Sequence, residues 1–404
     1  MDSSLSDNTS SDLPTTKPSS ISVQSIILPN KFTKVKRLRP TIQLDLDDTL
    51  VKFGEKIRNR WLVKGLIGSG GYGEIYYASD LKMNGESVAV KVEPVLRKGK
   101  VAKRIILEQK IMLRLQGQPH APLMWGSGTE HGLNYIVMQL LSTNVADLKK
   151  QCPLQRLSKS TSGRIMQQAI AGLRDMHKVG YIHRDVKPAN MCFGLTEKSS
   201  RRLIIVDYGL ARKFRQSDGK PVERRKRVGF RGTLRYVSMR VHDRMEQGPS
   251  DDLIALFFTL IEILKGELPW RNEKSDEKIK NAKMELVKDD FAKISENVGY
   301  NMREYGRAVM TLDVDAEPNY TFLISTMKVA TFETLGSQNK TIYICENEIF
   351  VFTISKTRRK NKNEMIVPGP NHIQLDKTNL AGGRHLNDPY DWENDYLEVL
   401  KECK

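Results

Sequence analysis

The sequence has 404 residues, of which 39% are hydrophobic and 28% are charged. This balance is typical of a globular protein and excludes collagen-like, wholly disordered and membrane classes. Lys and Arg number 65 against 48 Asp and Glu, which gives a formal net charge of +17. The surplus favours anionic partners, such as acidic or phosphorylated proteins or nucleic acid, without choosing among them.

The cysteines and apolar runs predict a reducing compartment and no membrane partner. The four cysteines lie far apart and form no C-x-x-C pair, so neither a disulfide framework nor a zinc ribbon is expected. The N-terminus lacks a basic region followed by an apolar core, and therefore predicts no secretory signal. The longest apolar run, Leu253 to Leu264, is shorter than the roughly 20 residues that a bilayer span needs. We expect a cytoplasmic protein, with the nucleus as the alternative location.

Hydrophobic periodicity predicts two lobes after an N-terminal arm. Residues 1–56 are rich in Ser, Thr and Pro and then in Lys and Arg, which predicts a disordered arm, with order beginning near Ile57. Residues 57–142 combine strand patterns with a helical pattern over residues 101–115, as expected for a small β-rich lobe. Residues 143–330 carry mainly helical patterns, including residues 165–177 and 252–264. The expected fold class is α+β, with two lobes.

The segment 331–387 does not fit this scheme. Strand-like runs begin at Thr341 and Ile349 and are followed by a loop rich in Lys, Arg and Asn. A hairpin insertion, an irregular loop and translated non-coding sequence are the interpretations that stay open. Residues 388–404 would then complete the domain and form a C-terminal tail.

A glycine-rich turn between two strands is the first chemical signal. Its glycines let the backbone bend sharply and bring N–H groups to phosphate oxygens, which a Cβ would obstruct. A strand follows it, as in a kinase nucleotide hairpin, whereas a helix would suggest a dinucleotide fold. By itself the turn is also consistent with a merely flexible hairpin. The candidate nucleotide contacts here are Ile67, Gly68, Ser69, Gly70, Gly71, Tyr72, Gly73, Ile75 and Ala89.

Lys91 ends the Val-Ala-Val-Lys run that follows the turn. Its ammonium is expected to bind the α- and β-phosphates of ATP and to need a carboxylate that holds it in place. Glu108, on the following predicted helix, is the candidate partner. Glu93 is nearer in sequence, but it is expected to be an exposed charge in a loop.

The segment His183-Arg-Asp-Val-Lys-Pro-Ala-Asn190 matches the kinase catalytic loop H-R-D-x-x-x-x-N. Asp185 would orient the substrate hydroxyl and accept its proton, Lys187 would neutralise charge on the migrating phosphoryl group, and Asn190 would bind Mg²⁺. Asp207 follows seventeen residues after Asn190 in Asp-Tyr-Gly, a variant of D-F-G, and would be the second Mg²⁺ ligand. A single Asp of this kind usually belongs to a structural ion pair, but all four residues in order and spacing favour catalysis.

An acidic segment near the arm competes with this interpretation. Asp45, Asp47 and Thr49 match the D-x-D-x-T nucleophile motif of haloacid dehalogenase-type phosphatases. That chemistry needs a buried strand before the first Asp, whereas the preceding residues are polar. A solvated acidic segment is the commoner origin of such a pattern.

Several further motifs resemble the casein kinase 1 group of protein kinases. The usual A-P-E is absent, and Gly229-Phe-Arg-Gly-Thr-Leu-Arg-Tyr-Val-Ser238 stands in its place. Phe-Arg-Gly-Thr and the terminal Tyr390-Asp-Trp-Glu393 are similar to tau-tubulin kinases in particular. The resemblance covers residues 57–330 and 388–395. Within it Val237-Ser-Met239 varies the family's Ser-x-Asn ending, so the peptide-binding floor is expected to differ.

The resemblance implies a bilobal kinase that uses ATP and Mg²⁺. It implies an adenine site against a hinge at Leu140 and Leu141, with Met138 as gatekeeper. It also implies a monomer, activity without activation-loop phosphorylation, protein substrates, and cytoskeletal proteins among the partners. Asp252, at the start of the most apolar predicted helix, would cap that helix and, by resemblance, hold the catalytic loop.

The residues between Asp207 and Gly232, here called the activation segment, carry many basic side chains opposed only by Asp218 and Glu223. Such a run is usually a solvated face, but this segment lines the peptide groove in kinases. We therefore expect acidic or already phosphorylated substrates. The expected anion-binding residues are Arg224, Arg225, Lys226 and Arg227.

Two other functions compete with this one. A pseudokinase scaffold usually lacks the lysine, the catalytic Asp or the metal Asp, and here Lys91, Asp185 and Asp207 are all present. A nucleic-acid-binding protein is prompted by the net charge of +17, but no aromatic-basic module or recognition helix accompanies it.

Overall fold

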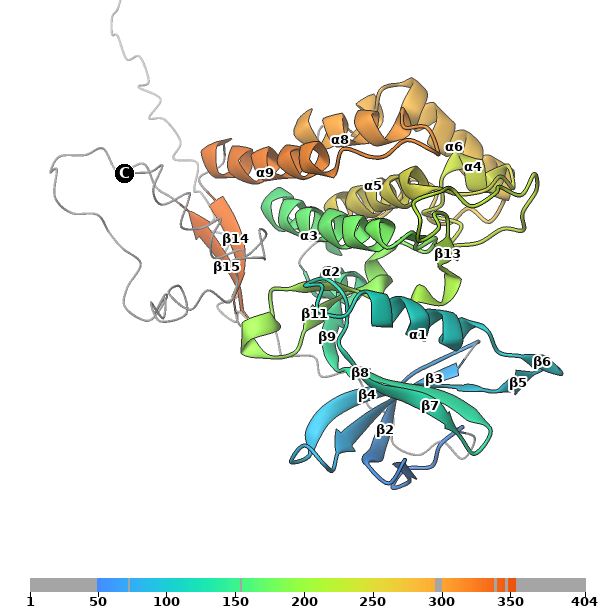
Figure 1. Ribbon diagram of the computed structural model, residues 1–404. Helices are drawn as coiled ribbons and strands as arrows, with labels where there is room; N and C mark the ends of the chain where they lie inside the picture. The colour runs from blue at the N-terminus through green and yellow to red at the C-terminus, as the bar shows by residue number, and fades with distance from the viewer. Residues whose placement is uncertain are drawn as a thin grey trace, which may run out of the picture. The chain divides into compact units, whose positions relative to one another are not determined.

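The computed structural model describes residues 49–71, 73–152, 155–294, 300–337, 340–345 and 348–353. The small lobe consists of one antiparallel sheet, in the order β1-β2-β3-β4-β8-β7, and one main helix (Figure 1). The strands are β1 (Lys56–Ile57), β2 (Trp61–Gly70), β3 (Gly73–Asp80), β4 (Glu86–Pro94), β7 (Met124–Glu130) and β8 (Leu133–Gln139). Between β4 and helix α1 (Arg104–Arg114) lies a two-stranded ribbon of β5 (Leu96–Arg97) and β6 (Lys100–Val101).

The alternation of side chains along β4 divides the small lobe into two faces. Val88, Val90 and Val92 belong to one buried cluster, which also contains Trp61 and Tyr76. Ala89 belongs instead to the main core, and Lys91, two residues further, therefore points toward the same side. The period of two in this strand places the lysine on the face of the sheet that meets the large lobe.

The large lobe is mainly helical, as predicted. Its helices are α2 (Val145–Gln151), α3 (Lys159–Lys178), α4 (Met239–His242), α5 (Pro249–Lys265), α6 (Asp276–Lys288), α8 (Tyr300–Met310) and α9 (Tyr320–Ser337). Its short strands are β9 (Leu141–Asn144), β10 (Tyr181–Ile182), β11 (Met191–Gly194), β12 (Leu203–Ile205) and β13 (Arg212–Lys213). Together the lobes have the arrangement that the resemblance implied, a β-rich lobe and a helical lobe.

Helices α3 and α5 form the centre of the large lobe. Helix α3 begins after Ser158, whose side chain accepts the N–H of Thr161. Helix α5 has Pro249 at its first position and ends at Gly266, which has a φ of 94°. Both helices are buried over nearly their whole length, which confirms the two predicted helical segments. Among the described residues no helix is long and apolar enough to cross a membrane.

The boundaries of the domain differ from the predicted ones at both ends. The small lobe includes residues before Ile57, because Val51 is only 4% exposed and its N–H donates to the Tyr76 hydroxyl at 2.9 Å. So short a segment has no period that could have revealed it. At the other end, the expected boundary at residue 330 falls inside α9.

The first part of the segment 331–387 forms regular secondary structure. Its first residues complete α9, and β14 (Lys340–Cys345) then pairs with β15 (Glu348–Thr353) as an antiparallel hairpin. The hairpin is one of the interpretations that the sequence left open. Residues 388–395, the C-terminal part of the resemblance, lie outside the described residues, as do residues 1–48 with Asp45 and Asp47.

Candidate active site

The glycine-rich turn between β2 and β3 leaves open space where a ligand can approach. A Cβ added at Gly70 or Gly71 would meet nothing within 4 Å, and one at Gly68 only the Ile75 Cβ at 3.9 Å. Ser69 is exposed, and Tyr72 lies outside the described residues. Gly73 has a different reason to be glycine, because a Cβ there would lie 2.1 Å from the Val92 carbonyl oxygen of the neighbouring strand.

Lys91, Glu108 and Asp207 form the ionic centre between the lobes. Lys91 Nζ lies 2.6 Å from Glu108 Oε2 and 3.2 Å from Asp207 Oδ1. Burial lowers the pKa of Lys91, but the charges of the two carboxylates outweigh it, so the pKa lies above its ordinary value. The predicted pair is confirmed in its geometry, and Lys91 carries a full charge where phosphates would lie.

Glu93 is not the exposed loop charge that we expected. It lies within β4, is 5% exposed, and its Oε2 accepts the backbone N–H of Ile105 at 3.1 Å. The first N–H groups of a helix have no partner inside the helix, and the residue that precedes α1, Lys103, makes no side-chain cap. Glu93 therefore caps α1 from the sheet and fixes the helix that carries Glu108.

The catalytic loop residues converge on Asp185. Lys187 Nζ lies 2.7 Å from Asp185 Oδ2, and the side-chain nitrogen of Asn190 donates to the Asp185 backbone oxygen at 2.9 Å. The Thr233 hydroxyl donates to Asp185 Oδ1 at 2.6 Å and accepts from Lys187 Nζ at 3.1 Å. Thr233 was not among the predicted site residues, because it lies 48 positions from Asp185 and joins the site only through folding.

Asp252 holds the catalytic loop from below. Its carboxylate accepts the backbone N–H groups of His183 at 2.6 Å and Arg184 at 2.8 Å, and it contacts His177 Nε2 at 2.9 Å. Burial raises the pKa of Asp252, but the hydrogen bond and charge of His177 outweigh it, so the carboxyl stays ionised. The expected capping role is wrong for Asp252: the neighbouring Asp251 accepts the Gly248 N–H at 2.7 Å.

Asp207 and Asn190 supply the oxygen ligands that suit a magnesium ion. Asp207 has a left-handed backbone conformation, with φ of 67°, and its side chain is 47% exposed. Asn190 donates through its nitrogen to Asp185, and within the described ranges its amide oxygen accepts no hydrogen bond, so that it could bind a cation. The residue after Asp207, Tyr208, is buried and donates its hydroxyl to the Ile205 carbonyl at 2.8 Å.

Apolar side chains lie beside this centre, toward the connection between the lobes. Ala89 pairs with Met138 across β4 and β8, and both side chains are buried. Ile67 and Ile75 are half-buried against the same core, and Leu140 and Leu141 follow Met138 where β8 passes into β9. A flat heteroaromatic ring suits apolar surroundings of this kind.

Comparison with known proteins identifies the family. The model of the protein kinase domain matches residues 61–327. A Caenorhabditis elegans protein named as a casein kinase I is 39% identical over 305 residues, which cover 75% of this chain and 87% of the relative. The chain belongs to the protein kinase family, in its casein kinase 1 group.

More distant relatives support the same assignment. A Dictyostelium discoideum protein named as a serine/threonine-protein kinase is 33% identical over 71% of this chain and 57% of its own length. A second Caenorhabditis elegans protein of that description is 34% identical over 59% of this chain and 69% of its own length. The chain is a serine/threonine protein kinase.

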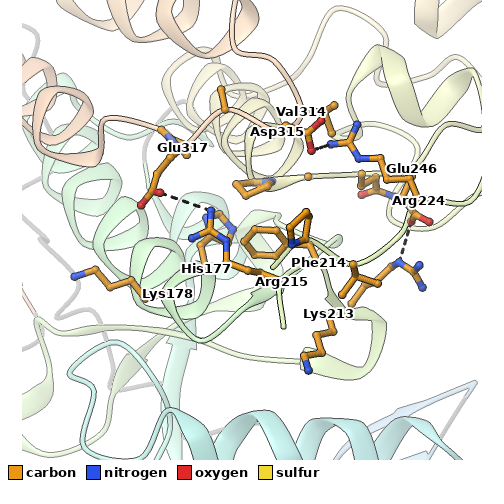
Figure 2. Close-up of a pocket in the computed structure, with 18 of the residues that line it drawn as sticks. His177, Lys178, Lys213, Phe214, Arg215, Arg224, Glu246, Val314, Asp315 and Glu317 are labelled. Atoms are coloured by element: carbon orange, nitrogen blue, oxygen red, sulfur yellow. Dashed lines mark hydrogen bonds and ion pairs between the residues drawn. The ribbon is translucent and has the colours of Figure 1, made fainter. Parts of the chain in front are cut away.

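Carboxylates that lie later in the chain neutralise part of the positive charge of the activation segment. Figure 2 shows a pocket beneath it, where Arg215 pairs with Glu317 and Arg224 with Asp315. Glu246 accepts from Arg225 at 2.8 Å and from Arg212 at 3.0 Å. Two of the four predicted anion-binding residues, Arg224 and Arg225, thus already contact carboxylates.

The other two predicted anion-binding residues differ. Lys226 and Arg227 are exposed and form no ion pair with any residue of the described ranges. Arg184, on the catalytic loop, is half-buried near the same cluster, and burial together with Arg212 lowers its pKa to about 10. The positive charge of Arg184 and Arg212 is offset by Glu246, whereas that of Lys226 and Arg227 faces solvent.

Proposed function

We propose that this kinase transfers the γ-phosphate of ATP to Ser or Thr residues of proteins that are acidic or already phosphorylated near the target. The observation that carries the substrate preference is the pair Lys226 and Arg227, exposed and without a carboxylate partner in the described structure. Arginine and lysine in this position bind carboxylate or phosphate by charge-assisted hydrogen bonds.

The proposed use of ATP and Mg²⁺ is supported by the family and by the residues around Lys91. The protein kinase domain implies ATP as the phosphate donor and Mg²⁺ as its companion ion. Adenine would lie near Ala89, Met138 and Leu141, and the phosphates would lie against Lys91. Mg²⁺, held by Asn190 and Asp207, would neutralise charge on the phosphates.

The experiment compares two peptides that differ only in one phosphoserine near the target serine. We expect a higher kcat/KM for the phosphorylated peptide, and this advantage should shrink as salt is raised, because exposed charges are screened. The double variant Lys226→Glu, Arg227→Glu should lose most of the advantage and leave the KM for ATP within about twofold, since neither residue contacts the nucleotide site.

A matched control changes the same amount of charge elsewhere. Lys64→Glu with Lys82→Glu reverses two exposed lysines on the small lobe. This control should keep the preference for the phosphorylated peptide. Equal rates of the wild-type enzyme on acidic, phosphorylated and basic peptides would show that the activation segment is surface charge only.

The pairing of Arg224 with Asp315 and Arg225 with Glu246 gives these two arginines a smaller expected part in substrate binding. They stay predicted anion-binding residues, because a phosphate can compete with a carboxylate for an exposed guanidinium. Membership of the tau-tubulin kinase branch, cytoskeletal partners, a monomeric state and a cytoplasmic or nuclear location stay predictions.

A further inference from the structure

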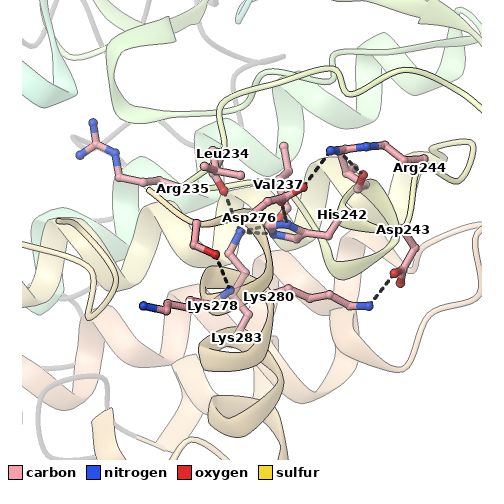
Figure 3. A network of polar contacts seen from close by, with 12 residues as sticks. Leu234, Arg235, Val237, His242, Asp243, Arg244, Asp276, Lys278, Lys280 and Lys283 are labelled. Carbon is pink, nitrogen blue, oxygen red and sulfur yellow. Dashed lines mark hydrogen bonds and ion pairs between the residues drawn. The ribbon is translucent and has the colours of Figure 1, made fainter. Parts of the chain in front are cut away.

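Lys283, on α6, has an amine that is completely buried in the large lobe. It is 0% exposed, and its ammonium contacts the carbonyl oxygens of Leu234 at 3.0 Å and Val237 at 2.7 Å, and His242 Nε2 at 3.1 Å (Figure 3). An ammonium group has three N–H donors and no acceptor. All three donors therefore have a partner.

The partners of Lys283 fix the protonation of His242. Because Nε2 accepts from the ammonium, the ring proton is on Nδ1, which donates to Asp276. Asp276 also accepts from Arg244 at 2.8 Å. A continuous chain of hydrogen bonds thus joins Lys283 to the surface pair of Asp276 and Arg244, as Figure 3 shows.

No carboxylate contacts Lys283 directly among the described residues. Its nitrogen lies 5.0 Å from the ring centre of Phe258 and 5.6 Å from that of Trp270, which stabilises the charge through the aromatic faces. Burying an ammonium is nevertheless unfavourable, and it lowers the pKa of Lys283 to about 7. A methionine of similar length would fill this site without that cost.

The backbone that Lys283 holds is the segment Thr233–Val237, here called the substrate loop. Trp270 Nε1 donates to the Arg235 carbonyl at 2.9 Å. Together with the two carbonyls that accept from Lys283, three carbonyl oxygens of this loop are therefore bound by side chains. The first residue of the loop, Thr233, contacts both Asp185 and Lys187. A shift of the loop would therefore move Thr233 relative to Asp185, beside the place that the substrate hydroxyl is expected to occupy.

We propose that Lys283 is a positioning residue for the protein substrate, because it fixes the substrate loop against α6 and keeps Thr233 in register with Asp185. Lys283 touches neither nucleotide nor reacting atoms. The proposal rests on protein kinase activity alone and not on the preference for acidic substrates.

The test compares Lys283→Met with Lys280→Met, a change on the same helix whose lysine pairs with Asp243 and is 28% exposed. The substrate is the serine peptide that the wild-type enzyme phosphorylates fastest. We expect Lys283→Met to raise the KM for the peptide about tenfold, with the KM for ATP within about twofold, and Lys280→Met to leave both unchanged. A merely structural role would move both constants or neither, and either result would overturn the proposal.

His242 provides a second test that does not depend on how Lys283→Met folds. His242→Gln keeps an acceptor near the position of Nε2, whereas His242→Leu removes it. We expect the peptide KM to rise in the leucine variant and to stay near the wild-type value in the glutamine variant. The same peptide KM in both variants would refute the positioning role, while a wild-type enzyme that phosphorylates no peptide would instead refute the kinase function.

Discussion

The Oδ2 atom of Asp252 lies 2.6 Å from the backbone nitrogen of His183, so the most buried helix of the large lobe directly holds the catalytic loop. This contact spans 69 positions of the sequence. Because of this contact, the position of Asp185, two residues further along the loop, depends on the packing of α5 in the large lobe.

Replacing Asp252 should damage folding and catalysis together. Asp252→Ala leaves a buried and a partly buried backbone N–H group and His177 without their acceptor, a loss of about 3–5 kcal/mol by analogy with broken buried pairs. We expect a lower Tm and a lower kcat, measured by thermal unfolding and peptide phosphorylation. A variant as stable and as active as the wild type would contradict this account of the loop.

Replacing Asp185 should separate binding from chemistry. Asp185→Asn keeps the shape of the side chain but cannot accept a proton, so we expect kcat to fall by about 100- to 10,000-fold. The KM for ATP should change little, because Lys91, Asn190 and Asp207 remain. A large loss of ATP binding, measured by titration with a fluorescent nucleotide, would mean that the carboxylate organises the cleft rather than the reaction.

Glu93 offers a prediction that the sequence alone did not suggest. Glu93→Ala removes the acceptor for the Ile105 N–H, so α1 should shift and the Lys91–Glu108 contact should weaken. We expect kcat/KM for ATP to fall about tenfold, which corresponds to about 1.4 kcal/mol. Glu93→Gln keeps an oxygen acceptor and serves as the control. Identical kinetics for both variants would show that Glu93 does not fix the position of α1.

The buried charge of Lys283 should appear in the pH dependence of stability. Its pKa falls from an unfolded value of 10.5 to about 7, so between these pH values the unfolded chain holds a proton that the folded chain has lost. The free energy of unfolding therefore rises with pH across this window, by an amount on the order of a few kcal/mol, and is unaffected by this group below pH 7.

The measurement is the difference in Tm between the wild type and Lys283→Met from pH 6 to pH 9.5. The titratable and charged groups near the amine are His242 and Arg244, at and just after the end of α4, and Asp276 and Lys280, on α6 itself. On the α5 side its neighbour is the Phe258 ring. The wild type should gain stability relative to the variant as pH rises. A constant difference would show that Lys283 keeps its proton throughout.

The sequence brought out the candidate site residues because each of them stands in a short motif with fixed spacing. The pairing of Lys91 with Glu108, the convergence of Lys187 and Asn190 on Asp185, and the position of Asp207 all follow from such motifs. The two lobes and their main helices were likewise readable from hydrophobic period, because α3 and α5 are long and buried.

The missed residues are those whose role depends on packing between distant segments. Glu93 looked exposed because Pro94 follows it, yet β4 extends through both residues to reach the start of α1. Thr233 and Lys283 carry no motif of their own, and only the fold brings them to the catalytic loop and to the substrate loop. The pairing of Arg225 with Glu246 could not be predicted from the sequence for the same reason.

Tyr208 has a consequence for the mobility of the segment around Asp207. Its ring lies 5.6 Å from that of His183, and its buried hydroxyl donates to the Ile205 carbonyl, a bond that phenylalanine at this position could not make. Any rearrangement that moves this aromatic side chain out of its site must here break a buried hydrogen bond as well. The segment that follows Asp207 should therefore be held more firmly here than in a variant with phenylalanine at position 208.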